Sequence, residues 1–87
     1  MLQFVLSLNA IKQLNKLPKN DQVRIKQKLL FWEQQKNPLD FAKPLVNFRF
    51  ATHRFRVGDY RIICRTEQKE LIIVVIKISH RNDVYKR

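Results

Sequence analysis

This chain of 87 residues has one cysteine, one glycine and only seven acidic side chains. A disulfide bond or a cysteine-based zinc site needs at least two cysteines. Because Cys64 is the single cysteine, both features are excluded within one chain. The longest apolar run, residues 71–76, is far too short to cross a bilayer, and the N-terminus lacks the basic start and cleavage site of a signal peptide. We therefore expect one cytoplasmic domain over residues 1–87, with no membrane association.

The scarcity of acidic residues leaves a large excess of positive charge. Eighteen lysines and arginines give a formal net charge of +11. A small domain with this charge is expected to bind polyanions, and nucleic acid is the commonest such partner. A membrane surface and an acidic protein are the other candidates, but no helix here is basic on one side and aromatic on the other, as membrane binding would require.

The single glycine lies in the most informative stretch, residues 54–61. Gly58-Asp59 between two strand-like runs predicts a β-hairpin with a two-residue loop. Arg56 then lies directly opposite Arg61, and both share one face of the hairpin with Arg54. The other face carries Phe55, Val57, Tyr60 and Ile62.

Like charges placed opposite each other destabilise a sheet. A hairpin that accepts Arg56 opposite Arg61, with no acidic residue on that face, is therefore expected to bind an anion there. The alternative is a solvated arginine face that serves only solubility. Because a guanidinium forks onto two phosphate oxygens and stays charged, these arginines suit a phosphate of RNA.

Apolar spacing predicts two helices after an N-terminal strand at residues 2–7. Ser7 or Asn9 is the expected cap of the first helix, which Pro18 ends. The second helix is expected to run to about Lys36, with Asn20 or Asp21 as its cap. Its predicted apolar stripe is Ile25, Leu29 and Trp32, widened by Leu30 and Phe31.

Three strands are expected to follow an irregular connection at residues 39–47. Their predicted ranges, with a turn at residues 67–69, are 48–57, 60–66 and 70–78. Because the last strand is apolar on both sides, we expect it to be central or covered on both faces. The predicted fold is α+β, with two N-terminal helices packed on one face of a small, twisted, mainly antiparallel four-stranded sheet. Cys64, opposite His53, is expected to be buried on the core face.

The hairpin, together with the segment Ser-His-Arg-Asn-Asp-Val-Tyr at residues 79–85, resembles the RelE/ParE superfamily of bacterial toxins. The shared pattern is an arginine-aliphatic-arginine strand, a Val-Gly-Asp-Tyr-Arg turn, a hydrophobic strand, then His-Arg and Val-Tyr. It occurs here in that order, and strand-helix-helix precedes it. The resemblance covers essentially the whole chain and implies a RelE-like fold.

The resemblance to RelE-type toxins also implies roles for single residues. Arg81 matches the arginine that is assigned as the general acid in these toxins. Arg61 matches the arginine that clamps the phosphate, and Tyr85 matches the tyrosine that stacks on a base. Thr52 and Arg54 stand where these toxins carry two lysines, which leaves the general base open.

From the residues alone, His80 is the side chain near the site whose unperturbed pKa, about 6.5, suits acid–base work. His80 or ribosomal RNA is then the candidate substitute for the missing base. Arg54 and Arg56 are expected to bind RNA.

The expected function is that of a type II toxin: a ribosome-dependent, metal-independent endoribonuclease that cuts mRNA by attack of a 2′-hydroxyl on the adjacent phosphate. No cofactor is expected. The expected partners are the ribosome, mRNA and an acidic antitoxin, with DNA reached only through the antitoxin. The antitoxin is expected either to fill the arginine face with carboxylates or to displace the C-terminal segment. Two alternatives remain: a ParE-like inhibitor of DNA gyrase and a nucleic-acid-binding module without cleavage activity.

Overall fold

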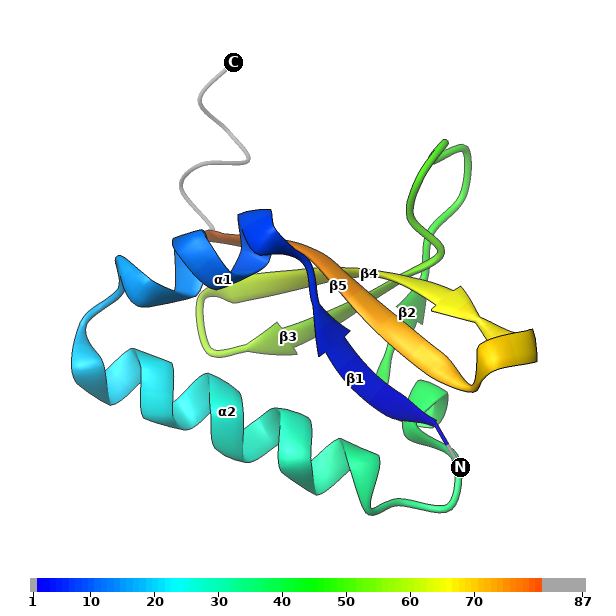
Figure 1. Cartoon of the computed structure of the whole chain (residues 1–87), viewed down its shortest axis with the longest axis horizontal. Helices are drawn as coiled ribbons and strands as arrows, with labels where there is room; N and C mark the ends of the chain where they lie inside the picture. The colour runs from blue at the N-terminus through cyan, green and yellow to red at the C-terminus, as the bar shows by residue number, and fades with distance from the viewer. Residues whose placement is uncertain (1, 81–87) are drawn as a thin grey trace.

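The computed structural model describes residues 2–80 (Figure 1). Its elements follow in the order β1 (Gln3–Leu6), α1 (Leu8–Asn15), α2 (Lys19–Glu33), the 3-10 helix η1 (Pro38–Phe41), β2 (Lys43–Pro44), β3 (His53–Val57), β4 (Tyr60–Glu67), the 3-10 helix η2 (Gln68–Glu70) and β5 (Ile72–His80). The predicted α+β class, with two N-terminal helices before the main strands, is confirmed.

The strands form one sheet in the order β1-β5-β4-β3-β2. β1 pairs parallel to β5, and the other neighbours pair antiparallel. The predicted strand count of four is one too few, because Lys43 and Pro44 pair with Arg54 and His53 as an extra short strand. The apolar strand β5 is central, as its composition predicted.

Helix α1 hydrogen-bonds to the part of β5 that extends beyond its pairing with β1. Ser7 caps the helix by accepting a hydrogen bond from the Ala10 N–H at 3.1 Å. Its hydroxyl also donates to the Ile76 carbonyl, and the Ile78 N–H donates to Gln13 Oε1 at 2.7 Å. These bonds satisfy backbone groups of β5 for which residues 2–80 provide no neighbouring strand on that side.

Helix α2 lies against one face of the sheet (Figure 1). Ile25, Leu29 and Trp32 are buried, as the predicted stripe requires. Leu30 and Phe31 are exposed, so the predicted widening of the stripe is wrong. The helix begins one turn earlier than a cap at Asn20 or Asp21 would allow, because Pro18 precedes its first residue and extends the backbone there.

Aromatic rings from three elements form the centre of the core. The ring centroids of Trp32 and Phe55 are 4.5 Å apart, and Phe4 packs edge-on to Phe55 at 5.3 Å. Residues of β3, β4 and β5 that face α2 complete this core: Val57, Tyr60, Ile62, Cys64, Ile73, Val75 and Ile78. The arginine face of the hairpin is therefore the side of the sheet away from α2.

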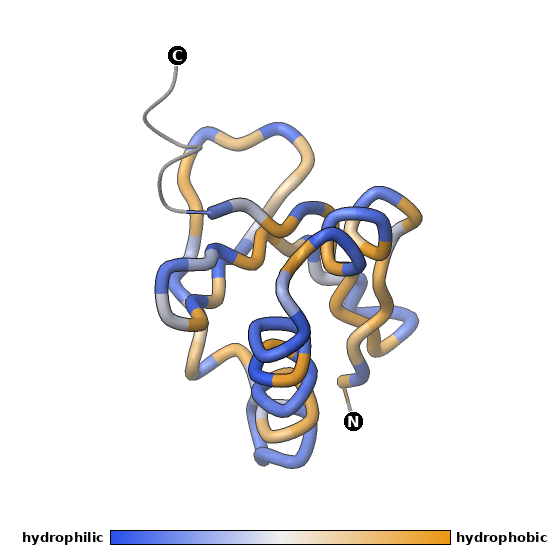
Figure 2. The backbone as a smooth tube through the Cα atoms, turned by 90° about the vertical axis from the view of Figure 1, so that its left-hand side faces the viewer, coloured by the Kyte–Doolittle hydropathy of each residue, from blue (hydrophilic) through white to orange (hydrophobic). Residues whose placement is uncertain are grey.

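The first of the three strands predicted after the helices is shorter than expected. A strand was predicted over residues 48–57, and residues 48–50 do alternate apolar and polar side chains, yet β3 begins at His53. Residues 46–51 instead form a loop that rises from the sheet on the side away from α2 (Figures 1 and 2). No strand of residues 2–80 pairs with this stretch, so its alternation has no face to bury.

Candidate functional site

The hairpin has the predicted register. Gly58 has φ = 56°, whereas Asp59 keeps a negative φ, which is the pattern of a type II′ turn. Arg56 pairs with Arg61, and Arg54 pairs with Ile63. The two-residue loop alone thus places all three arginines on one face.

Neighbouring strands add further cations to this face. Lys43 of β2 pairs with Arg54, and Lys77 of β5 pairs with Ile63. Opposed residues share a face, so one side of the sheet carries a set of basic residues that we call the arginine face: Lys43, Arg54, Arg56, Arg61 and Lys77. Arg56 and Lys77 are exposed, and Arg54 and Arg61 are half-buried.

Within residues 2–80, few acidic residues occur in the strands that carry the arginine face. Among the described strands β2 to β5, Glu67 is the only acidic residue, and its carboxylate pairs with Arg65 at 2.9 Å. A surface of one sign attracts and orients polyanions over distances of about 8 Å at physiological salt. This arrangement suits the phosphates of a nucleic acid.

His80 lies on the other face of the sheet. In the register of β4 and β5, Tyr60 is opposite His80, and Arg61 is opposite Ser79. The rings of Tyr60 and His80 meet edge to face, with centroids 5.2 Å apart. The fold therefore brings Arg54, Arg56 and Arg61 together but places the His80 ring beside Tyr60, on the α2 side.

The remaining two predicted catalytic residues, Arg81 and Tyr85, lie outside the described residues. Their roles, like that of His80, stay predictions. The strand that ends at His80 does run beside β4, next to Arg61.

Two residues of α2 contact the hairpin turn, and neither contact was predicted from the sequence. The Tyr60 hydroxyl donates to Asp21 Oδ2 at 2.7 Å. This bond, with burial and the carboxylate charge, raises the pKa of Tyr60 to about 12. The Arg24 guanidinium lies so close to Gly58 that a Cβ on the glycine would meet its Nη2 at 2.8 Å. Asp21 is 39 residues from Tyr60, so no local pattern could have indicated the pair.

Thr52 and His53 serve the structure at the start of β3. Thr52 Oγ1 accepts a hydrogen bond from the Thr66 N–H at 3.1 Å and lies 2.9 Å from His53 Nδ1. Burial lowers the pKa of His53, which favours the neutral imidazole. His53 pairs with the buried Cys64, as predicted.

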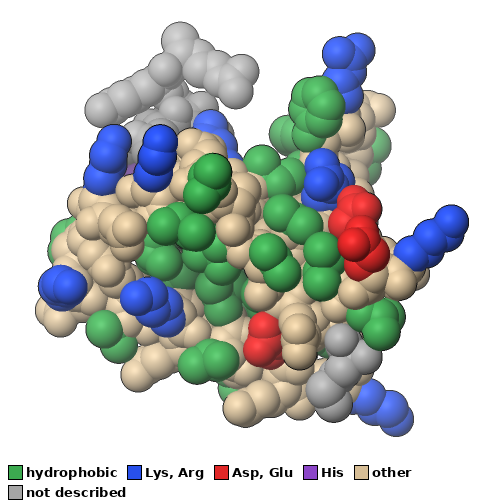
Figure 3. Space-filling view, viewed as in Figure 1, with side chains coloured by type: hydrophobic (Ala, Val, Ile, Leu, Met, Phe, Trp, Pro, Cys, Tyr) green, Lys and Arg blue, Asp and Glu red, His purple; other side chains and the backbone are tan. Residues whose placement is uncertain are grey.

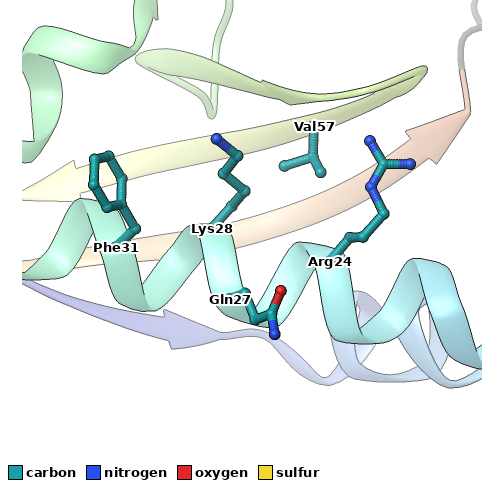
Figure 4. Close-up of a pocket in the computed structure, with 5 residues that line it drawn as sticks. All are labelled: Arg24, Gln27, Lys28, Phe31 and Val57. Carbon is teal, nitrogen blue, oxygen red and sulfur yellow. The ribbon is translucent and has the colours of Figure 1, made fainter.

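A shallow groove of about 360 Å³ separates α2 from the edge of the hairpin (Figure 4). It is lined by Arg24, Gln27, Lys28, Phe31 and Val57. Exposed apolar side chains continue this surface over α2 and η1, including Val23, Leu30 and Phe41. A partner on this side would meet cations and apolar groups together.

A membrane-spanning helix and a metal site would each leave a recognisable feature in residues 2–80. No helix there is long and apolar enough to cross a membrane. The same residues contain no cluster of three or more histidine, cysteine, aspartate or glutamate side chains that could hold a metal ion.

The basic hairpin and its fold match known proteins. Residues 4–85 match a family described as the ParE toxin of the type II toxin-antitoxin system parDE. The chain belongs to the RelE/ParE toxin superfamily. It is similar to Toxin RelG of Mycobacterium tuberculosis, with 30% identity over 78 residues that cover 90% of this chain and 88% of RelG. The chain is thus a toxin of the type II toxin-antitoxin class.

Solved structures of this superfamily have the same fold. The toxin-antitoxin complex RelBE2 of Mycobacterium tuberculosis contains a chain with a TM-score of 0.77 and 25% identity, covering 91% of this chain and 96% of that one. The archaeal RelE-RelB complex of Pyrococcus horikoshii gives a TM-score of 0.73 at 25% identity, covering 92% and 94%. The RelE-like architecture predicted from the sequence is confirmed.

Proposed function

We propose that this toxin is a ribosome-dependent endoribonuclease that cleaves mRNA in the cytoplasm, where ribosomes and mRNA are found. The observation that carries the proposal is the direct opposition of Arg56 and Arg61 on one face of the hairpin. Two guanidiniums on one face can hold the scissile phosphate and stabilise the charge that builds on it during cleavage.

The reaction needs no metal and no cofactor. The ribose 2′-hydroxyl loses its proton and attacks the adjacent phosphorus, which expels the 5′-oxygen, and that oxygen gains a proton. Arg56 and Arg61 supply the cationic clamp in this scheme, and Arg54 binds a neighbouring phosphate. Arg81 is proposed as the acid, and Tyr85 as the residue that stacks on a base.

The general base is the part of the scheme with least support from this chain. The Thr52 hydroxyl is engaged with Thr66, and the His80 ring lies beside Tyr60 on the α2 side. Proton removal by ribosomal RNA therefore fits better than removal by His80. Dependence on the ribosome follows, because the ribosome also holds the mRNA in a reactive geometry.

Cleavage of mRNA on purified ribosomes, mapped by primer extension, tests the proposal. We expect cuts with the wild-type chain, and a loss of rate on the order of 100-fold for Arg56→Gln or Arg61→Gln, because each removes part of the charge stabilisation. Lys26→Gln, at an exposed position of α2, removes the same charge elsewhere and should cleave normally. Uncut mRNA with the wild-type chain would contradict the proposal.

A second candidate function is supported by the family match itself, since the matching family is described as the ParE toxin. In that case the chain binds DNA gyrase and traps it on DNA. Incubation with gyrase and supercoiled plasmid separates the two: linear DNA after detergent treatment, with mRNA uncut, would favour the gyrase inhibitor. If neither occurs while RNA still binds, the chain is a nucleic-acid-binding module without cleavage activity.

The partner proposed for regulation is an acidic antitoxin. The related solved structures are toxin-antitoxin complexes. On this chain, the groove beside α2 and the exposed Val23, Leu30 and Phe41 offer the apolar and basic surface that an acidic, amphipathic segment would cover. In this proposal the antitoxin binds DNA, and the toxin contacts DNA only through the antitoxin.

A further inference from the structure

The loop of residues 46–51 exposes more apolar area than its length explains. Val46, Phe48 and Phe50 have exposed fractions of 74%, 59% and 67%. Within residues 2–80, neither phenylalanine ring packs on another aromatic ring. Exposed apolar clusters on small proteins mark binding surfaces.

The base of this loop is held in place. The Leu45 N–H donates to the Thr52 carbonyl at 2.9 Å, directly beyond the pairing of β2 with β3. Asn47 adopts the left-handed conformation, with φ = 64°, which asparagine tolerates better than most residues and which turns the chain. The phenylalanines are therefore presented on a loop whose two ends are fixed to the sheet.

The chemistry of the loop favours a nucleic acid over a protein. Arg49 separates the two exposed rings, and Lys43 precedes the loop, with no acidic residue between positions 43 and 51. Aromatic rings interleaved with cations are the usual platform for single-stranded nucleic acid, because every base has a face to stack and each link carries a phosphate. Figure 3 shows hydrophobic and basic side chains side by side on the protruding loop.

The position of the loop points to the same occupant. It rises on the side of the sheet away from α2, which is the side of Arg54, Arg56 and Arg61 (Figure 2). Only residue 52 separates it from β3, the strand that carries two of these arginines. By contrast, the apolar surface suited to a protein partner lies on the α2 side.

We propose that Phe48 and Phe50 stack on unpaired bases of a single-stranded RNA whose phosphates lie on the arginine face. This inference rests on the proposed function, since it extends the RNA path beyond the cleavage site. Arg49 contacts a phosphate between the stacked bases. The loop thereby adds a contact to unpaired nucleotides that a double helix cannot make, because its bases are stacked internally.

Fluorescence anisotropy with a labelled 12-nucleotide single-stranded RNA of mixed sequence tests the proposal. The double variant Phe48→Leu/Phe50→Leu keeps the apolar volume but removes both rings, so we expect the Kd to rise about tenfold. A blunt duplex of the same length should bind the wild-type chain and this variant equally. Phe41→Leu removes a ring that is 48% exposed on the α2 side, away from the proposed RNA path, and should leave both affinities unchanged.

Salt dependence separates stacking from charge. The double variant should keep the wild-type slope of log Kd against log salt, whereas Arg49→Gln should lower that slope by about 0.7. Thermal unfolding of each variant shows that the fold is retained.

Equal single-stranded RNA binding by the wild-type chain and the double variant would overturn the stacking proposal, as would a wild-type chain that does not bind the RNA. If sedimentation then showed a wild-type dimer that the double variant dissociates, the loop would be a contact between copies. Cleavage of mRNA on ribosomes is scored separately. Normal cleavage with no effect of the double variant on RNA binding would leave the proposed function standing and remove only the role of the loop.

Discussion

At the scale of single residues, Tyr60 links the core to the hairpin turn. Its ring is buried on the α2 face, its hydroxyl reaches Asp21, and its edge meets His80. The turn that sets the arginine register is thus tied to α2 through one side chain. Loss of this tie should loosen the turn without removing any arginine.

Replacement of Tyr60 tests this tie. Tyr60→Phe should lower the free energy of unfolding by about 1–2 kcal/mol, because Asp21 loses a donor in a partly buried place. The measurement is urea unfolding at neutral pH. Asp59→Ala, an exposed change in the same turn, serves as the control and should cost less.

The pH dependence of Tyr60 has a definite sign. Its pKa is about 12 in the folded state and near 10.0 when unperturbed, so folding favours the protonated phenol. The contribution to stability is complete below pH 10 and is lost as pH rises through about 12. Tyrosinate absorbance should therefore show a transition near pH 12 that is missing from Tyr60→Phe. Because the chain has a second tyrosine, the outcome that would contradict the hydrogen bond is a transition near pH 10 that Tyr60→Phe removes.

Gly58 is the second residue on which the site depends. Its φ of 56° lies in the left-handed region, where alanine is strained by about 1–2 kcal/mol. The contact of a new Cβ with Arg24 adds little, because that side chain is flexible. Gly58→Ala should lower the free energy of unfolding by about this amount in urea titration. Gly58→Asn, which tolerates positive φ, should cost less.

At the scale of elements, α1 acts as the missing neighbour of the end of β5. The Ile78 N–H has Gln13 Oε1 as its acceptor, and the Ile76 carbonyl accepts from Ser7. The pairing of β1 with β5 ends at Val75, one residue before this segment. Side chains from α1 and its cap therefore take the place of a neighbouring strand along the stretch of β5 that β1 does not pair with. The edge of β5 that leads to Arg81 is therefore stabilised by α1.

Gln13→Ala should expose this edge. The Ile78 N–H would lose its acceptor, and the free energy of unfolding should fall by about 1–2 kcal/mol. Hydrogen exchange should speed up at Ile78 before it does at residues of β4. Lys12→Ala, at an exposed position of the same helix, should change neither. Unchanged exchange at Ile78 in Gln13→Ala would contradict the assigned bond.

At the scale of the whole molecule, the two faces differ in chemistry. The side away from α2 carries the arginine face and the loop of residues 46–51, and the α2 side carries the groove and exposed apolar groups. The hairpin edge adds a third feature, because β2 pairs only with residues 53 and 54 of β3. Arg56 thus turns its backbone N–H and C=O toward an edge with no strand among residues 2–80.

This division predicts where an antitoxin is bound. Co-expression with the acidic protein of a neighbouring reading frame should yield a complex in which hydrogen exchange slows at Arg56 and along α2. The reason is that a segment covering the groove beside α2 also reaches the open edge of β3. Protection confined to residues 8–15 would contradict this location.

The comparison of sequence and structure shows which features are local. Gly58 and Asp59 determine the hairpin register by themselves, because a two-residue loop allows one pairing and the face of each side chain follows by alternation. The apolar run of β5 predicted a strand that is central or covered on both faces, and Ser7 was one of two predicted caps of the first helix. The net charge and the motif at the hairpin already indicated the class of partner.

Only the tertiary structure decided the rest. A strand was predicted over residues 48–57, yet no strand among residues 2–80 pairs with residues 48–51, and these belong to a loop with exposed rings. Asp21 looked like a cap but bonds to Tyr60, and the β4–β5 pairing set the His80 ring on the face away from the arginines. Local patterns determine turns, caps and the faces of a strand, because these depend on neighbours a few residues away. Which face is buried, and which distant side chain completes a hydrogen bond, depends on contacts that form only when the whole chain has folded.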